Sequence, residues 1–121
     1  MMTVNDLQGL VRRFADERDW GKIHTPRNLI LALSGEVGEV AELLQWTTDA
    51  DVEAWLADPA NVQMLSLELA DVFSYLLRLS DVCGVDLESA LRTKVELNET
   101  RYPVALSKGS SKKYDQLTGQ S

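Results

Sequence analysis

The sequence predicts an all-α protein, a four-helix-bundle-like fold that is completed by oligomerisation. Apolar residues recur at every third or fourth position through most of the chain, which is the period of a helix with one buried face. No segment alternates apolar and polar residues as a half-buried strand does. The chain has 121 residues, 45% of them hydrophobic, which suits one domain with its own core. We expect this domain to cover residues 1–106 and a polar tail to cover residues 107–121.

The first two helices are marked by apolar spacing and by a start signal. Side chains at i, i+3, i+4 and i+7 predict a helix over about residues 4–18, namely Leu7, Leu10, Val11 and Phe14. A second helix is expected from Pro26 to about Trp46. Thr25 can cap it through its hydroxyl, and proline suits the first helical position because its missing N–H would have no partner there.

A loop and a second long helix come next. The Asp58–Pro59 step and the aspartates before it predict a loop, with one short turn around residues 52–56. The long helix is expected over about residues 62–83 and ends at Gly84, because glycine is the preferred residue just past a helix C-terminus.

The last predicted helix begins after Asp86, whose side chain can cap it, and ends near Arg101 before Pro103. The tail from Ser107 is polar and contains Gly and Ser, a composition typical of disorder.

The helix over residues 62–83 carries apolar side chains on nearly every side. Leu67, Phe73 and Leu77 fall outside the arc formed by Met64, Leu65, Leu69, Val72 and Leu76. Such a helix must be buried nearly all round, and four helices of one short chain cover it poorly. We therefore expect a homo-oligomer with this helix near the interface. The alternative is that Phe73 and Leu77 pack under the first helix of the same chain.

The charge balance excludes several classes of partner. Twelve Lys and Arg residues oppose nineteen Asp and Glu residues, for a net charge of −7. This argues against binding of a nucleic-acid polymer or an anionic membrane, because both need clustered basic residues. No apolar run approaches the roughly 20 residues that span a bilayer. A single cysteine, Cys83, and no recognisable export signal lead us to expect a cytoplasmic protein.

Two pairs of carboxylates fall where core residues are expected. On a helical wheel, Glu36 lies inside the apolar arc of the second helix and Glu39 lies at its edge. Glu68 and Asp71 lie in the apolar sector of the next long helix, with Tyr75 between them in angle. Residues three apart on a helix are neighbours, about 5–6 Å apart at Cβ. If the two helices face each other, four carboxylates meet in one small volume.

Carboxylates this close together need a compensating cation. Unpaired buried carboxylates are costly, and like charges raise one another's pKa. Oxygen ligands select Mg²⁺, Mn²⁺ or Ca²⁺ over zinc, and Mg²⁺ is usually shared with substrate phosphates. The alternative is that these residues lie on an exposed face. Glu42, on the polar side of the wheel, is either a surface residue or a ligand or base at the edge of the cluster.

Other side chains suit the remaining parts of a nucleotide. Lys94, Asn98 and Arg101 share one side of the last helix and can bind phosphates, although a solvated helix end would look the same. Flat side chains flank the acidic segments and can stack on a nucleobase, although a Trp at such a spacing is more often a core residue. They are Trp20, His24, Trp46 and Tyr75.

Three motifs together are specific. They are W-x-x-x-H-x-P-R-N and G-E-x-G-E-x-A-E-L-x-Q-W within residues 17–46, and E-L-x-D-V within residues 66–76. With K-V-E-L-N-E-T-R-Y-P over residues 94–103, they resemble the MazG-like all-α nucleoside triphosphate pyrophosphohydrolases, most closely the dCTP pyrophosphatase branch. The likeness covers nearly the whole chain and extends to the Ser110–Tyr114 segment, so Lys112 and Lys113 are expected to fold over bound phosphates.

The resemblance implies a MazG fold and hydrolysis of a nucleoside triphosphate, such as dCTP or a modified dCTP, to the monophosphate and pyrophosphate. It implies Mg²⁺, with Mn²⁺ as a substitute, on Glu36, Glu39, Glu68 and Asp71, which also serve in catalysis. The matching base-pocket positions are Trp20, His24, Trp46 and Tyr75, and the matching phosphate-side positions are Lys94 and Asn98. It also implies a homodimer or homotetramer with sites shared between chains.

One departure from the family pattern and three rival functions stay open. Where the animal enzymes of this branch have a pocket histidine, this chain has Val11, so a strict preference for dCTP does not follow. A rival of another class is a non-catalytic helical module that binds a partner or holds Ca²⁺. Nearer rivals are a dUTP pyrophosphatase and a phosphoribosyl-ATP pyrophosphatase.

Overall fold

The structure is a computed structural model that describes residues 1–118, with Thr118 described by its backbone alone. Those residues form helices and connecting turns without a strand, which confirms the predicted all-α class. The last three residues of the predicted tail, 119–121, lie outside the described residues. The chain divides into two compact units, Met1–Val85 and a second unit that begins at Asp86.

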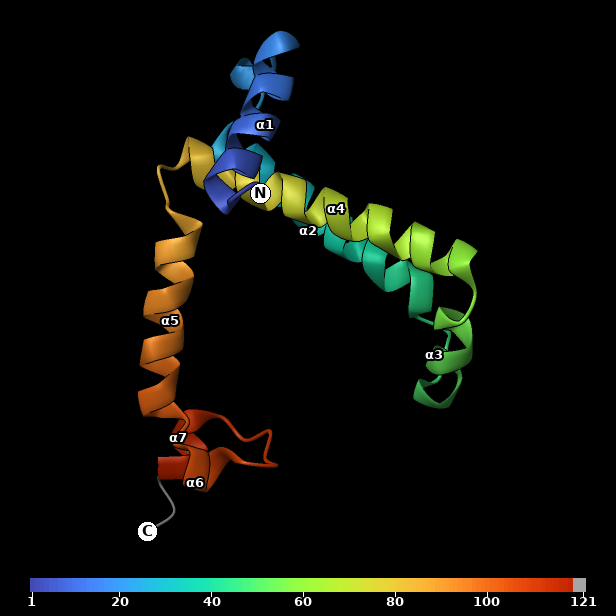
Figure 1. Ribbon diagram of the computed structural model, residues 1–121, viewed down its shortest axis with the longest axis vertical. Helices are drawn as coiled ribbons and strands as arrows, with labels where there is room; N and C mark the ends of the chain where they lie inside the picture. The colour runs from blue at the N-terminus through green and yellow to red at the C-terminus, as the bar shows by residue number, and fades with distance from the viewer. Residues whose placement is uncertain (119–121) are drawn as a thin grey trace. The chain divides into compact units, whose positions relative to one another are not determined.

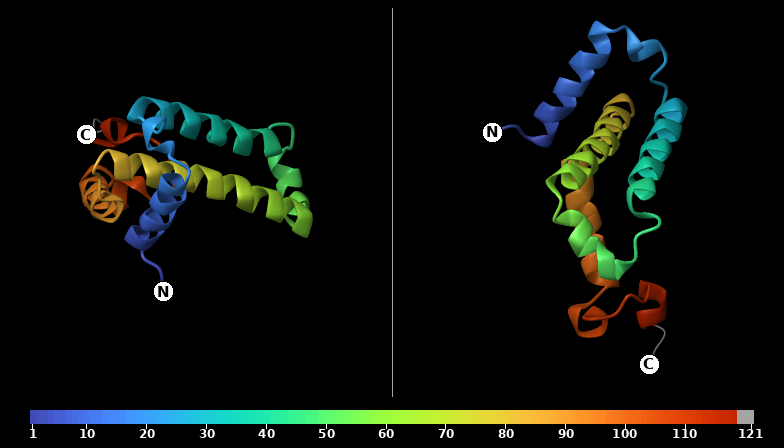
Figure 2. Two further views of the ribbon diagram at one scale, coloured as in Figure 1. Left: turned by 90° about the horizontal axis from the view of Figure 1, so that it is seen from above. Right: turned by 90° about the vertical axis from the view of Figure 1, so that its right-hand side faces the viewer.

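The first unit is organised around two long antiparallel helices. They are α2 (Pro26–Leu44) and α4 (Pro59–Val82), which lie side by side in Figures 1 and 2. Helix α1 (Val4–Glu17) crosses α4 near its C-terminal end, and α3 (Asp49–Leu56) connects the far ends of the pair. A short 3₁₀ turn, η1 (Trp20–Lys22), leads from α1 toward α2.

The predicted start and stop signals act as expected in this unit. The Thr25 hydroxyl accepts a hydrogen bond from the Asn28 N–H at 3.2 Å, with Pro26 at the first helical position of α2. Gly84 follows α4 with φ +69°, a left-handed conformation that glycine adopts without strain. These local signals therefore set the beginning of α2 and the end of α4.

The predicted loop between the two long helices is mostly helical instead. Helix α3 begins at Asp49 rather than forming one short turn, and α4 begins at Pro59 rather than near Val62. The Asp58 side chain accepts a hydrogen bond from the Ala60 N–H at 2.9 Å and so caps α4. Pro59 takes the first helical position. An aspartate followed by proline signals a helix start as well as a loop.

The core of the first unit is small. Its buried hydrophobic side chains are Ala15 on α1, Leu29 on α2 and Leu77 on α4. Leu77 lies with Leu7 along an apolar groove between α1 and α4, whereas Phe73 in the same groove is 41% exposed. The packing under α1 that we considered as an alternative thus holds for Leu77 and incompletely for Phe73.

The second unit contains α5 (Leu87–Arg101), α6 (Val104–Ser107) and α7 (Tyr114–Thr118). Asp86 caps α5 by accepting a hydrogen bond from the Ser89 N–H at 3.1 Å, as predicted. The disorder expected after Ser107 is wrong for α7. Its Tyr114 ring stands edge-on to Tyr102 at 6.2 Å and Leu117 is buried, because apolar residues three apart give this short polar segment one apolar face.

The described part of the chain contains no helix that is both long enough and apolar enough to cross a membrane. The division at residues 106 and 107 between a domain and a tail stays a prediction.

Candidate active site

The acidic side chains of α2 and α4 meet where the two helices lie side by side. One carboxylate oxygen from each of Glu36, Glu39 and Glu68 lies within 4.8 Å of the others. Glu36 and Glu39 are one helical turn apart on α2, so both reach toward Glu68 on the neighbouring helix. We call these three residues the acidic cluster.

Asp71 lies next to the acidic cluster, one turn after Glu68 on α4. It lines the same cavity as Glu36, and its charge contributes to the raised pKa of both Glu36 and Glu68. The four carboxylates picked out on the helical wheel are therefore neighbours in the structure. Glu42 is exposed, and its charge also contributes to the raised pKa of Glu68.

The described residues leave part of the acidic cluster without a hydrogen-bond partner. Among the described residues, the Oε2 atoms of Glu36 and Glu68 are buried and have no hydrogen-bond partner. Loss of hydration, followed by the nearby carboxylates of Glu39, Asp71 and Glu68, raises the pKa of Glu36 to about 7. The carboxyl of Glu39 is the main cause of the raised pKa of Glu68.

These observations show that the donor set fits a hard divalent cation. Such a cation accepts several carboxylate oxygens at once and offsets their mutual repulsion. It would also provide the buried Oε2 atoms of Glu36 and Glu68 with a partner, which the described residues do not supply.

A cavity of about 210 Å³ opens beside the acidic cluster. Glu36 and Asp71 form its acidic end, and three of the predicted base-pocket residues, Trp20, His24 and Tyr75, line it too. Its other lining residues were not predicted as site residues; they are Val11, Phe14, Ala15, Ser74 and Arg78. Val11, which stands where the animal enzymes of the branch have a pocket histidine, is thus part of the cavity lining.

The turn between α1 and α2 places the aromatic wall of the cavity. Asp19 has φ 55°, a left-handed conformation that aspartate tolerates better than most residues, and the chain reverses there after α1. The Trp20 ring then stands edge-on to Phe14 at 5.6 Å and to His24 at 5.7 Å. The turn at Asp19 therefore brings together the rings of Phe14 on α1, Trp20 on η1 and His24 in the segment before α2.

Four of the predicted site residues belong to other parts of the chain. Trp46 follows the end of α2, is 90% exposed and is not among the residues that line this cavity. Lys94, Asn98 and Arg101 lie on α5 in the second unit, where the Arg101 guanidinium stands 4.6 Å from the centre of the Tyr114 ring. The roles of these four residues stay predictions.

Arg78 is the residue of greatest consequence that the sequence reasoning missed. It is 7% exposed and its Nε donates a hydrogen bond to His24 Nδ1 at 3.0 Å. The sequence contained a signal for it: Arg78 is the one charged residue between Asp71 and Asp81, and it follows Tyr75 by three positions. That spacing places it on the face of α4 that carries Tyr75 and Asp71.

Comparison with known proteins establishes the family. A sequence model of the MazG-like family matches residues 31–117. The chain belongs to the MazG-like family. This result agrees with the resemblance carried by the motifs and with the all-α fold.

Individual relatives match this MazG-like protein over nearly its whole length. It is 50% identical over 117 residues to "dCTP pyrophosphatase 1" of Rattus norvegicus and 47% identical over 115 residues to "dCTP pyrophosphatase 1" of Homo sapiens. Each alignment covers 95% of this chain and 68% of the relative. The crystal structure of a pyrophosphatase from Archaeoglobus fulgidus is similar with a TM-score of 0.77 and 38% identity, over 85% of this chain and 94% of that one.

Proposed function

We propose that this MazG-like protein hydrolyses nucleoside triphosphates, with dCTP or a modified dCTP as the preferred substrate, to the monophosphate and pyrophosphate. The observation that carries the proposal is the acidic cluster with its two unpartnered oxygens, open to a cavity lined by Trp20, His24 and Tyr75. The relatives named dCTP pyrophosphatase 1, matched along 95% of this chain, support dCTP as the substrate.

Glu36, Glu39, Glu68 and Asp71 would hold the divalent cation, Mg²⁺ with Mn²⁺ as a substitute. When bound, such an ion neutralises phosphate charge and lowers the pKa of a coordinated water. The same four carboxylates are the proposed catalytic residues. Glu39 is exposed at the edge of the cluster, and Glu42 lies one turn further along α2, so either can orient a water or accept its proton.

The cavity is suited to the nucleoside end of the substrate. The carboxylates of Glu36 and Asp71 line it together with the rings of Phe14 and Trp20, which stand edge-on to each other. Stacking of a base on an aromatic ring contributes about 1–3 kcal/mol and tolerates different bases. We propose that Trp20, His24, Tyr75 and Trp46 contact the nucleoside and that Lys94, Asn98 and Arg101 contact the phosphates.

We also propose that the active form is a homodimer or homotetramer. A cavity of about 210 Å³ is smaller than the roughly 300–1,000 Å³ typical of small-molecule sites, so one chain encloses part of a nucleotide. Large apolar side chains on the two long helices are about half exposed, including Ile30, Leu31, Leu67 and Leu69. A second copy that covers them would both bury this apolar surface and complete the site.

A reducing compartment suits the single cysteine. Cys83 is free and exposed, and a thiol in that state persists in the cytoplasm, where we propose the protein acts.

The test is a panel of nucleotides with Mg²⁺. The protein is incubated with each common NTP and dNTP, and with phosphoribosyl-ATP, then with inorganic pyrophosphatase, and released phosphate is measured. We expect phosphate from dCTP that depends on the added pyrophosphatase and disappears with EDTA. Glu36→Gln should abolish it, whereas Glu53→Gln, an exposed position on α3, should not.

The other outcomes identify the rivals. Strong preference for dUTP or for phosphoribosyl-ATP assigns the protein to those activities within the same fold. No product from any nucleotide contradicts the proposed enzyme and favours a non-catalytic helical module that binds a partner or holds Ca²⁺.

A further inference from the structure

Arg78 is a buried cation that forms part of the cavity lining. Its side chain is 8% exposed, and within the described part of the chain its guanidinium has two polar partners: His24 Nδ1 at 3.0 Å from Nε, and Asp81 Oδ2 at 3.4 Å from Nη1. A charge removed from water in this way needs a fixed counter-charge, which Asp81 supplies from the next turn of α4.

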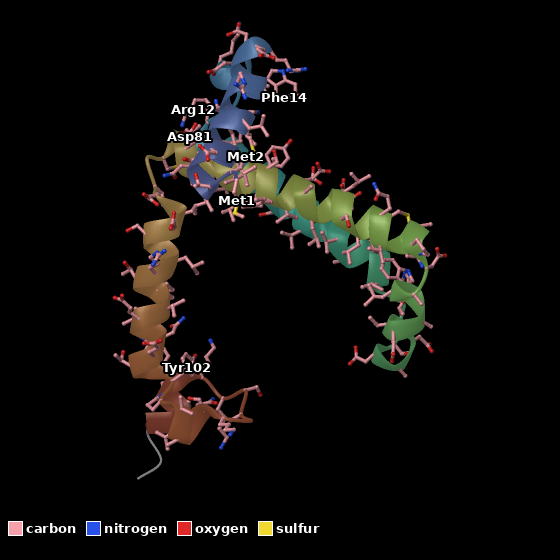
Figure 3. The ribbon with its side chains drawn as sticks, in the orientation of Figure 1. Met1, Met2, Arg12, Phe14, Asp81 and Tyr102 are labelled. Atoms are coloured by element: carbon pink, nitrogen blue, oxygen red, sulfur yellow. The ribbon has the colours of Figure 1, made fainter. Side chains whose placement is uncertain are left out.

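Asp81 is itself held from the other side. The Arg12 guanidinium on α1 donates two hydrogen bonds to its carboxylate, one from Nε at 2.7 Å to the oxygen that faces Arg78 (Figure 3). Arg78 therefore lies in a chain of polar contacts from α1 through α4 to the segment before α2. The guanidinium has little freedom to leave His24, because Asp81 and the surrounding helices restrain it.

The contact between Arg78 and His24 determines which ring nitrogen carries the proton. A guanidinium in a protein stays protonated and offers donors alone. The histidine nitrogen that faces it must accept, so Nδ1 carries no hydrogen. In a neutral imidazole the hydrogen is then on Nε2, which makes Nε2 a donor.

His24 is in a position to use that donor. It lines the cavity together with Trp20, whose ring stands edge-on to it at 5.7 Å. Burial, and secondarily the charge of Arg78, lower the pKa of His24, which favours the neutral ring near pH 7. Val11, at another point of the lining, has no polar side-chain atom to offer.

We infer that Arg78 is a positioning residue that holds His24 with Nε2–H as the donor, and that this donor binds an acceptor atom of the nucleotide. The acceptor is a carbonyl oxygen or ring nitrogen of the base, or a phosphate oxygen. The assignment of the tautomer stands on the geometry alone, whereas the identity of the ligand rests on the proposed function.

Nitrogen NMR tests the tautomer directly, because His24 is the one histidine of the chain. In the ¹⁵N-labelled full-length protein, long-range proton–nitrogen correlations distinguish a protonated ring nitrogen from an unprotonated one. We expect unprotonated Nδ1 and protonated Nε2 at pH 7. Protonated Nδ1, or a mixture of tautomers, in the unmodified protein overturns the inference without the need for any variant.

Variants test whether Arg78 causes this state. Arg78→Met keeps a long side chain but has no donor, so we expect His24 to be a mixture of tautomers in this variant. Arg78→Lys keeps a charged donor and should restore part of the His24 signal pattern of the unmodified protein. Arg92→Met is the matched control, because the Arg92 side chain is 76% exposed and pairs with Glu88 on the same helix. An unchanged His24 pattern in a folded Arg78→Met overturns the positioning role. If that variant does not fold, the same comparison uses Arg78→Leu, which also lacks a donor, and an unchanged His24 pattern there overturns the positioning role in the same way.

Ligand titrations and kinetics test the second part of the inference, the contact between His24 Nε2–H and the nucleotide. The Nε2 signal of His24 should move on addition of dCTP, and deoxycytidine or inorganic triphosphate alone shows which end supplies the acceptor. Arg78→Met should raise KM for dCTP about three- to tenfold with a smaller change in kcat, the loss expected for one hydrogen bond. No movement of the signal with any of these three probes contradicts the ligand contact. Absence of hydrolysis by the unmodified protein would instead contradict the proposed function and leave the tautomer result intact.

Discussion

A carboxylate oxygen of Glu36 on α2 and one of Glu68 on α4 lie within 4.8 Å of each other, and no described residue offers a hydrogen-bond partner to the buried Oε2 of either. Like charges held this close oppose the packing of the two long helices. The arrangement is thus unfavourable for the protein alone and favourable for a protein that binds a cation. Four predictions follow from this site and from the contacts around it.

Mg²⁺ should raise the thermal stability of the protein, because a cation that binds the folded site and not the unfolded chain shifts the equilibrium by mass action. At a hundredfold excess over the dissociation constant the gain is about 2.7 kcal/mol. Thermal denaturation followed by circular dichroism, with Mg²⁺ and with EDTA, measures it. Glu36→Gln should lose most of the shift, and Glu53→Gln should keep it. Equal melting temperatures with and without Mg²⁺ in the unmodified protein would contradict the assigned cation site.

Glu68→Gln and Asp71→Asn should each lower kcat/KM for dCTP by about a hundredfold or more, since each removes a proposed ligand charge while keeping the side-chain shape. Neither change should unfold the chain, because both relieve repulsion among neighbouring carboxylates. Steady-state kinetics and circular dichroism are measured on the same preparations. Near-normal turnover in either variant removes that residue from the catalytic set.

Trp46→Ala should leave the fold of the single chain intact, because the Trp46 side chain is 90% exposed in it. We expect a higher KM for dCTP, weaker discrimination between bases and weaker self-association, since a large exposed indole is suited to a contact between copies. Light scattering after gel filtration gives the assembly state, and competition between dCTP and other dNTPs gives base choice. If assembly, KM and base choice are all unchanged, Trp46 has no part in the site or the interface.

Arg12→Met should destabilise the protein modestly near pH 7, because it removes a charge-assisted pair in which one partner is half exposed and screened by solvent. The hydrogen bond from Arg12 is the main reason why the pKa of Asp81 lies below its ordinary value of 3.8. A carboxyl with a lowered pKa in the folded state stabilises the protein above its unfolded pKa, and this contribution is lost as the pH falls through the folded value. The stability difference between the two proteins should therefore be constant above about pH 5 and shrink below pH 3.8. Urea denaturation at several pH values measures it, and a difference that does not depend on pH contradicts the pairing.

Much of the fold could be predicted because it depends on local signals. The period of apolar residues, the caps at Thr25 and Asp86 and the stop at Gly84 act within one or two helical turns, and the structure confirms each of them. The errors have local causes too. The Asp58–Pro59 step is equally compatible with a loop and a helix start, and the polar composition after Ser107 concealed the apolar face of α7.

The sequence by itself determined the helices, the spacing of their carboxylates and the family, because these depend on residues close together in the chain. The tertiary structure decided which faces meet. It brings Glu36 and Glu39 to Glu68 and joins Arg78 to His24, a residue 54 positions away. It also leaves Trp46 outside the lining of the cavity and large apolar side chains of α4, such as Leu67 and Leu69, partly exposed. No helical wheel contains this information, because a wheel describes one helix and a site between helices depends on how two of them pack.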